Sequence, residues 1–124
     1  VRPDIGPVEY ESQLEARAIS LFARFTELTS LRSQPLTLVY RSRGSMLRYT
    51  PDFHVSLRHV PDELALLGFG HETFVEVKPW RCAAAQEALL ARKFSALRKA
   101  TGLPVVLLTD LDISPFCLGG AHGY

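Results

Sequence analysis

The sequence lacks the features that define several large classes of protein. Its 124 residues contain no apolar run near the roughly 18 residues that a membrane-spanning helix needs. A basic start followed by an apolar stretch, the mark of a secretory signal, is also missing. Two cysteines, Cys82 and Cys117, are too few for a disulfide framework or a four-ligand zinc site. These absences predict a cytoplasmic protein with two reduced thiols and no membrane contact.

Neither sign of charge is in large excess, because 14 basic and 13 acidic residues leave a net charge of +1. Acidic residues are nevertheless scarce in two segments. Residues 28–58 carry five arginines and one acid, and residues 79–102 carry five basic residues and one acid. This pattern is typical of a surface that follows phosphates, although solvated faces without a partner explain it equally well. We predict DNA contacts for five of these basic residues: Arg41, Arg43, Arg48, Arg81 and Lys93.

Hydrophobic residues make up 47% of the chain, which is enough for one domain over residues 1–124. Apolar residues at offsets of three and four predict helices over 12–28 and 83–100. Alternation and β-branched residues predict strands, and turn or polar residues predict the irregular parts. The predicted strands are 36–41, 49–58, 73–78 and 104–109, with a lead-in at 1–8, a loop at 59–72 and a tail at 114–124. This order predicts an α/β fold with a mixed sheet covered by helices.

Three residues together suit the hydrolysis of a phosphodiester. Glu76 and Lys78 stand two positions apart on one predicted strand, so their side chains share a face. Asp52 lies on the polar face of the strand predicted over 49–58, whose other face holds Tyr49, Pro51, Phe53, Val55 and Leu57. Two carboxylates can hold a hard divalent cation, and a lysine can orient the attacking water. The same residues also fit a solvated pair on an exposed strand face.

Glu15 is the fourth candidate, and it has two interpretations. It falls inside the apolar arc of the first predicted helix, where a carboxylate needs a cation or hydrogen bonds. Glu15 is also three residues after Ser12, which is the spacing of a helix capping box. We favour the metal ligand, with Glu11 as its substitute. His54, Trp80 and Lys93 are weaker candidates near the site, since an exposed or packed side chain explains each of them.

Four ordered motifs resemble the N-terminal domain of the TnsA endonuclease, the DNA-cutting subunit of heteromeric transposases. They are Glu-Ser-Gln-Leu-Glu at 11–15, Gln-Pro-Leu at 34–36, Tyr-Thr-Pro-Asp-Phe at 49–53 and Val-Glu-Val-Lys-Pro at 75–79. The resemblance covers roughly residues 9 to 113. It implies the restriction-endonuclease-like core of PD-(D/E)XK nucleases, with a central mixed sheet and flanking helices.

The resemblance also implies a chemistry and a set of partners. The implied catalytic residues are Glu15, Asp52, Glu76 and Lys78, and the implied metal ligands are Glu15, Asp52, Glu76 and Val77. The implied metal is Mg²⁺, for which Mn²⁺ substitutes. The implied substrate is double-stranded DNA, nicked at the 5′ ends of an element beside a transposase partner subunit.

Two alternatives stay open. The chain can be a stand-alone nuclease of a prophage or a defence system, or a catalytically silent domain that binds DNA or a protein. A bacterial or phage origin, with or without a homodimer, fits each interpretation.

Overall fold

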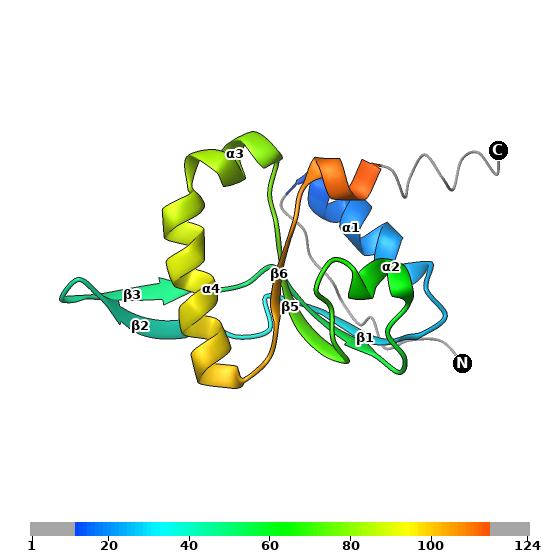
Figure 1. Ribbon diagram of the computed structural model, residues 1–124, viewed down its shortest axis with the longest axis horizontal. Helices are drawn as coiled ribbons and strands as arrows, with labels where there is room; N and C mark the ends of the chain where they lie inside the picture. The colour runs from blue at the N-terminus through cyan, green and yellow to red at the C-terminus, as the bar shows by residue number, and fades with distance from the viewer. Residues whose placement is uncertain (1–11, 115–124) are drawn as a thin grey trace.

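A mixed four-stranded sheet lies at the centre of the computed structural model, which describes residues 12–114 (Figure 1). Its strand order is β1-β4-β5-β6, in which β5 and β6 are parallel and the other neighbours are antiparallel. The four strands are β1 (Leu28–Ser33), β4 (Phe53–Leu57), β5 (Glu72–Val77) and β6 (Val105–Leu108). Two further strands, β2 (Leu38–Ser42) and β3 (Ser45–Tyr49), form a separate antiparallel hairpin. The predicted α/β class with a mixed sheet is confirmed.

The helices cover both faces of this sheet. The labelled ones are α1 (Gln13–Ala23), α2 (Asp62–Ala65), α3 (Trp80–Ala85) and α4 (Glu87–Thr101), and residues 110–114 are helical as well. In Figure 1, α1 and α2 lie on one side of β5 and β6, and α4 lies on the other side with the hairpin. No helix among residues 12–114 is long and apolar enough to cross a bilayer.

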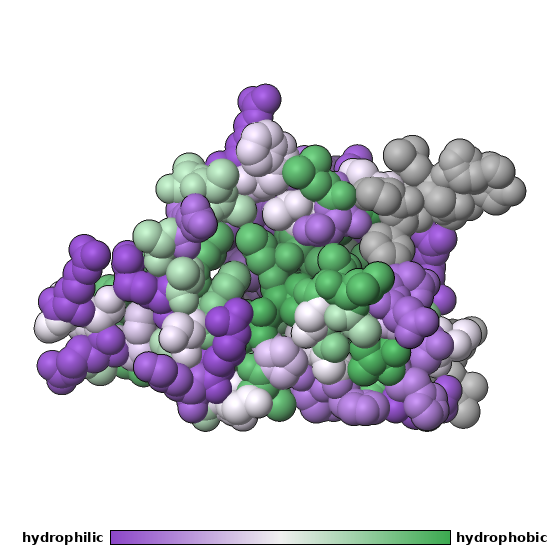
Figure 2. Space-filling model, in the orientation of Figure 1, coloured by the Kyte–Doolittle hydropathy of each residue, from purple (hydrophilic) through white to green (hydrophobic). Residues whose placement is uncertain are grey.

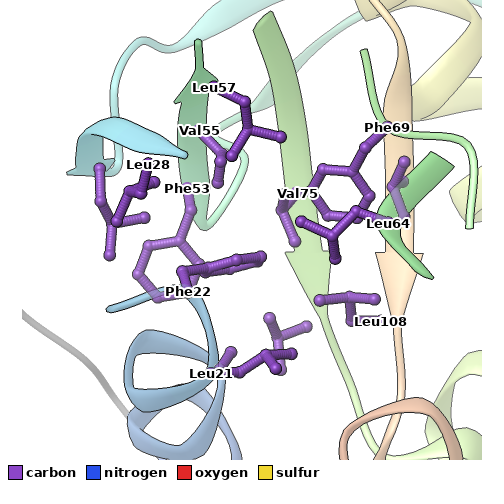
Figure 3. Packing of buried hydrophobic residues seen from close by; sticks show 14 of the residues in the cluster. Leu21, Phe22, Leu28, Phe53, Val55, Leu57, Leu64, Phe69, Val75 and Leu108 are labelled. Carbon is purple, nitrogen blue, oxygen red and sulfur yellow. The ribbon is translucent and has the colours of Figure 1, made fainter. Parts of the chain in front are cut away.

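Strand alternation in β5 separates two hydrophobic clusters. The larger cluster contains Val75 and Val77 together with residues of α1, and Figure 3 shows Phe22 of α1 beside Phe53 of β4. The smaller cluster joins Phe74 of β5 to the buried side of α4. Glu76 alternates with the valines and therefore faces the α4 side. The alternation thus places the candidate acid between the sheet and α4, on the face opposite Val75 and Val77.

The first helix is shorter than predicted. It begins after Ser12 and ends at Ala23, and Leu28, its predicted last residue, begins β1 (residues 28–33), a strand that was not predicted. Leu28 and Leu31 are both buried although they stand three apart, because the pairing of β1 with β4 is irregular between Leu28 and Ser30. This irregularity lets two residues three apart on a strand both face the core, and Leu28 continued the apolar stripe of the predicted helix although it belongs to β1. The prediction of a helix over 12–28 was therefore wrong in its last turn.

The strand predicted over 49–58 is shorter in the structure: only Phe53–Leu57 forms β4, and Tyr49 is the last residue of β3, a strand that was not predicted. Residues around Pro51 interrupt the ladder, so β3 ends at Tyr49 and β4 begins at Phe53. Tyr49 consequently packs in the smaller cluster, on the α4 side of the sheet, whereas Phe53 packs in the larger cluster, on the α1 side. The prediction that both lie on one face was wrong. Within β4 the predicted alternation is confirmed, since residues 53, 55 and 57 are buried and their neighbours are half-buried.

The remaining elements agree with the prediction to within a few residues, with two additions. The loop predicted over 59–72 contains the short helix α2, and the helix predicted over 83–100 is two helices, α3 and α4. Gly102 ends α4 in the left-handed conformation, at φ 72°. The lead-in, most of the tail, Glu11 and Cys117 lie outside the described residues.

Candidate active site

Asp52 and Glu76 meet where β4 and β5 pair. Phe53 is opposite Val75 in the antiparallel register, so Asp52, one residue earlier, falls beside Glu76. The side chain of Asp52 is held by the backbone, since its Oδ2 accepts a hydrogen bond of 2.7 Å from the Val77 N–H. The backbone carbonyl of Asp52 accepts a second bond of 2.8 Å from the Gln34 N–H. Asp52 is thus fixed by two neighbouring segments before any ligand is bound.

Glu76 is buried, and its two oxygens have different partners. Its Oε1 accepts a hydrogen bond of 2.8 Å from the Tyr49 hydroxyl. Its Oε2 lies 3.6 Å from the Nζ of Lys78. The Nζ of Lys93, on α4, lies 5.4 Å from the centroid of the Tyr49 ring, which is a cation–π distance. The sheet, the hairpin and α4 therefore each contribute a side chain to one cluster.

Burial raises the pKa of both carboxyl groups. The pKa of Asp52 is raised from 3.8 to about 6, first by burial and then by the negative charge of Glu76. Burial also raises the pKa of Glu76, against the lowering effects of the Tyr49 hydrogen bond and of the Lys78 and Lys93 charges. A hydrogen bond between the two carboxyl groups raises the pKa of Asp52 and lowers that of Glu76.

The pair fits the ligand set of a hard divalent cation. Two carboxylates forced together favour any positive species between them, and a proton takes that place at low pH. Among residues 12–114, no group of three or more His, Cys, Asp or Glu side chains is gathered for a metal. The side chain of Val77 is in the core and its N–H is bonded to Asp52, so only its carbonyl oxygen can serve as the predicted ligand.

Glu15 lies in the first turn of α1, and the structure supports one half of the predicted cap. The backbone N–H of Glu15 donates a hydrogen bond of 3.1 Å to the hydroxyl of Ser12, which is the N-cap residue. The Glu15 side chain is half-buried. Its role as a metal ligand stays a prediction, as does the substitution by Glu11.

Two weaker candidates have structural partners. The Nε2 of His54 lies 3.0 Å from Glu72, and its ring packs on Phe74 at 5.2 Å between centroids. The backbone N–H of Trp80 donates a hydrogen bond of 2.8 Å to Asp110, and its side chain is 44% exposed. The structure gives these residues contacts outside the carboxylate pair.

The five predicted DNA contacts are distributed around the cluster. Three of them, Arg41, Arg43 and Arg48, are exposed on the hairpin, and Arg81 is exposed on α3. Lys93 is half-buried against Tyr49 and lies closer to the carboxylates than its weak sequence signal suggested.

Sequence reasoning missed Tyr49 as a member of the site. The residue stands in the Tyr-Thr-Pro-Asp-Phe motif, but alternation through Pro51 assigned it to the apolar face. The signal that could have found it is Pro51 itself, because a proline inside an otherwise central strand argues for a break. After such a break the alternation of side chains between the two faces begins again, so the Tyr49 hydroxyl can face Glu76.

A comparison with protein-family models gave no match, and a comparison with curated proteins gave none either.

Proposed function

We propose that this protein is a metal-dependent endonuclease of the PD-(D/E)XK type that hydrolyses phosphodiester bonds in double-stranded DNA. The observation that carries the proposal is the pair of half-buried Asp52 and buried Glu76, with the ammonium group of Lys78 3.6 Å from Glu76. Buried carboxylates with raised pKa values beside a specific cation are typical of functional sites. A solvated Glu/Lys pair on a strand face would not show this burial.

Each residue of the cluster has a distinct part in this chemistry. Asp52 and Glu76 would hold Mg²⁺, or Mn²⁺ in its place, with Glu15 and the Val77 carbonyl as further predicted ligands. When bound, the metal neutralises charge on the phosphate and acidifies a water molecule. Lys78 orients that water and stabilises negative charge on the phosphate oxygens. Tyr49 fixes the rotamer of Glu76 through its hydroxyl, and the Val77 N–H fixes Asp52.

The mixed sheet, with helices on both faces and the carboxylates on adjoining strands, supports a restriction-endonuclease-like core. Together with the four motifs, it supports a role as the 5′-end-nicking subunit of a TnsA-like transposase that works with a transposase partner. A stand-alone nuclease of a prophage or defence system would use the same chemistry without that partner.

Cleavage of supercoiled plasmid in the presence of Mg²⁺ or Mn²⁺ tests the proposal. Asp52→Ala is expected to abolish cutting, and Glu63→Gln, which removes an exposed acid on α2, is expected to leave cutting unchanged. Undiminished cutting by Asp52→Ala, in a preparation free of host nuclease, would remove the proposal. A silent DNA-binding domain would bind duplex DNA but would neither cut it nor bind either metal in a calorimetric titration.

A further inference from the structure

The β2–β3 hairpin extends away from the carboxylate pair as an arm of two strands. Its base is the pair Leu38–Tyr49, so the arm begins at the residue whose hydroxyl binds Glu76. Its other end is the turn at Arg43 and Gly44, which lies at one extremity of the molecule (Figure 1). The four to five residue steps from Tyr49 to the turn span roughly 15 Å.

The arm carries positive charge without any acid to balance it. Residues 38–49 contain Arg41, Arg43 and Arg48 and no Asp or Glu. Cross-strand pairs of the arm combine an arginine with an apolar residue: Val39 with Arg48, and Met46 with Arg41. Val39 is 52% exposed and Met46 is 59% exposed. Hydrophilic side chains gather around this end of the molecule (Figure 2).

The turn at the tip of the arm is not built for stability. Arg43 has φ 52° and Gly44 has φ 81°, as in the two-residue turns that favour Asn, Asp or Gly at the first of these positions. A long side chain in the left-handed region is strained, and nothing within the turn requires arginine. The charge of Arg43 is therefore placed at the tip against the local preference of the backbone.

A basic groove lies beside the arm. It has a volume of about 420 Å³ between β2 and α4, and its charged lining residues are Arg41, Arg92 and Lys99. The other lining residues are Tyr40 and small side chains, and none is acidic. The groove is thus open to a polyanion that runs along the flank of the arm.

We propose that the β2–β3 hairpin is a DNA-binding arm, which enters the major groove of the duplex on one flank of the cleaved bond. The proposal rests on the nuclease function, because the flank is defined by the position of Asp52 and Glu76. A two-stranded ribbon fits a major groove about 12 Å wide, where arginine binds guanine and apolar side chains contact the thymine methyl. The phosphates beside the ribbon then pass over Arg92 and Lys99.

Duplex DNA fits this surface better than a second copy of the chain. Arms that met in a symmetric pair would bring together arginines that have no acid on either arm to receive them. The arm length of roughly 15 Å corresponds to about four to five base pairs at 3.4 Å each. Contacts of Arg43 are therefore expected about that far from the cleaved bond, and on one side only.

Arg43→Asn separates the stability of the turn from its charge. Asparagine tolerates the left-handed conformation, so the melting temperature is expected to rise by about 2–5 °C. The Kd for a fluorescein-labelled random duplex, measured by anisotropy in Ca²⁺, is expected to increase at least about fivefold. The log–log salt slope is expected to flatten by about 0.9. Hydroxyl-radical footprinting should lose protection on one flank of the cleavage position.

Three controls accompany this variant. Arg43→Lys keeps the charge and is expected to retain most of the affinity, whereas Arg43→Gly removes charge and strain and should bind as poorly as Arg43→Asn. Arg17→Gln removes one exposed charge from α1, on the other side of the sheet, and should change the affinity little.

A rise in melting temperature with no loss of duplex affinity would show that the hairpin is not a DNA-binding arm. An acidic protein segment would then be the better ligand for this basic surface. The test also separates the arm from the nuclease. If Arg43→Asn binds duplex DNA more weakly and the wild-type protein never cuts DNA, the hairpin would still be a DNA-binding arm and the proposed nuclease function would be wrong.

Discussion

Replacing Asp52 by asparagine is expected to stabilise the protein while abolishing its activity. The substitution keeps the shape of the side chain and an oxygen that can accept the Val77 N–H bond. It removes the negative charge beside Glu76 and adds an amide that can donate to that carboxylate. The repulsion and the burial that raise the pKa of Asp52 to about 6 would no longer oppose folding at neutral pH.

The magnitude follows from the difference between the folded and unfolded pKa values. A rise from 3.8 to about 6 corresponds to about 3 kcal/mol at 1.36 kcal/mol per pKa unit. Because solvent reaches part of this side chain, we reduce the figure to about 1–2 kcal/mol. The folded protein holds the proton more tightly than the unfolded chain. This contribution to stability is therefore fully present below about pH 4 and is lost as the pH rises through about 6.

Thermal unfolding between pH 4 and pH 8, without metal, measures the effect. At pH 8 we expect Asp52→Asn to melt about 3–8 °C above the wild type, and at pH 4 we expect little difference. Mg²⁺ should reverse the order, since a cation at 100 times its Kd stabilises the wild type by about 2.7 kcal/mol. Glu63→Gln, on exposed α2, serves as the control for the loss of one surface charge.

Two results would refute this reasoning. If Asp52→Asn were less stable than the wild type at pH 8 without metal, the Asp52 carboxylate would stabilise the fold as a hydrogen-bond acceptor. Its repulsion by Glu76 would then not be the dominant effect. If the difference in stability were the same at pH 4 and pH 8, its cause would not be the titration of Asp52.

Four other substitutions test the remaining roles. Lys78→Ala should lower the cleavage rate and keep metal binding, which calorimetry with Mn²⁺ measures; a collapse of metal affinity would make the division of roles wrong. Tyr49→Phe removes the hydrogen bond that lowers the pKa of Glu76, so the rise of activity with pH should move to higher pH; an unchanged profile would contradict this role. Glu15→Gln should be stable and inactive, whereas Ser12→Ala should be active but less stable by about 1 kcal/mol. The reverse pattern would make Glu15 structural.

The sheet could be predicted from the sequence wherever burial and alternation agree. In β4 and β5 the buried residues follow the period of two or form a continuous run, and both strands were predicted to within a few residues. In β1 the ladder irregularity places Leu28 and Leu31 inward at a helical spacing, so tertiary pairing with β4 decides the structure against the local pattern. Local periodicity carries no information on such pairing.

The carboxylate pair could also be predicted, because Asp52 immediately precedes β4 and Glu76 stands on β5, and these two strands pair. Two of their neighbours were placed by the three-dimensional structure, with Pro51 as the one sequence signal for the first of them. Tyr49 reaches Glu76 because the chain breaks at Pro51, and Lys93 lies over Tyr49 because α4 packs on that side of the sheet. Neither contact joins residues at a fixed spacing that could be recognised in the sequence.

The features that reduce stability lie together on one side of the molecule. Glu76 is buried against Asp52, Arg43 is in the left-handed region, and Met46 of the same arm is 59% exposed. Sequences that fold well agree with their structure at each level, and departures concentrate at functional sites. A purely structural domain would be more stable with asparagine at both Asp52 and Arg43. Because each residue is unfavourable for folding and suited to a metal or a phosphate, binding explains both better than packing does.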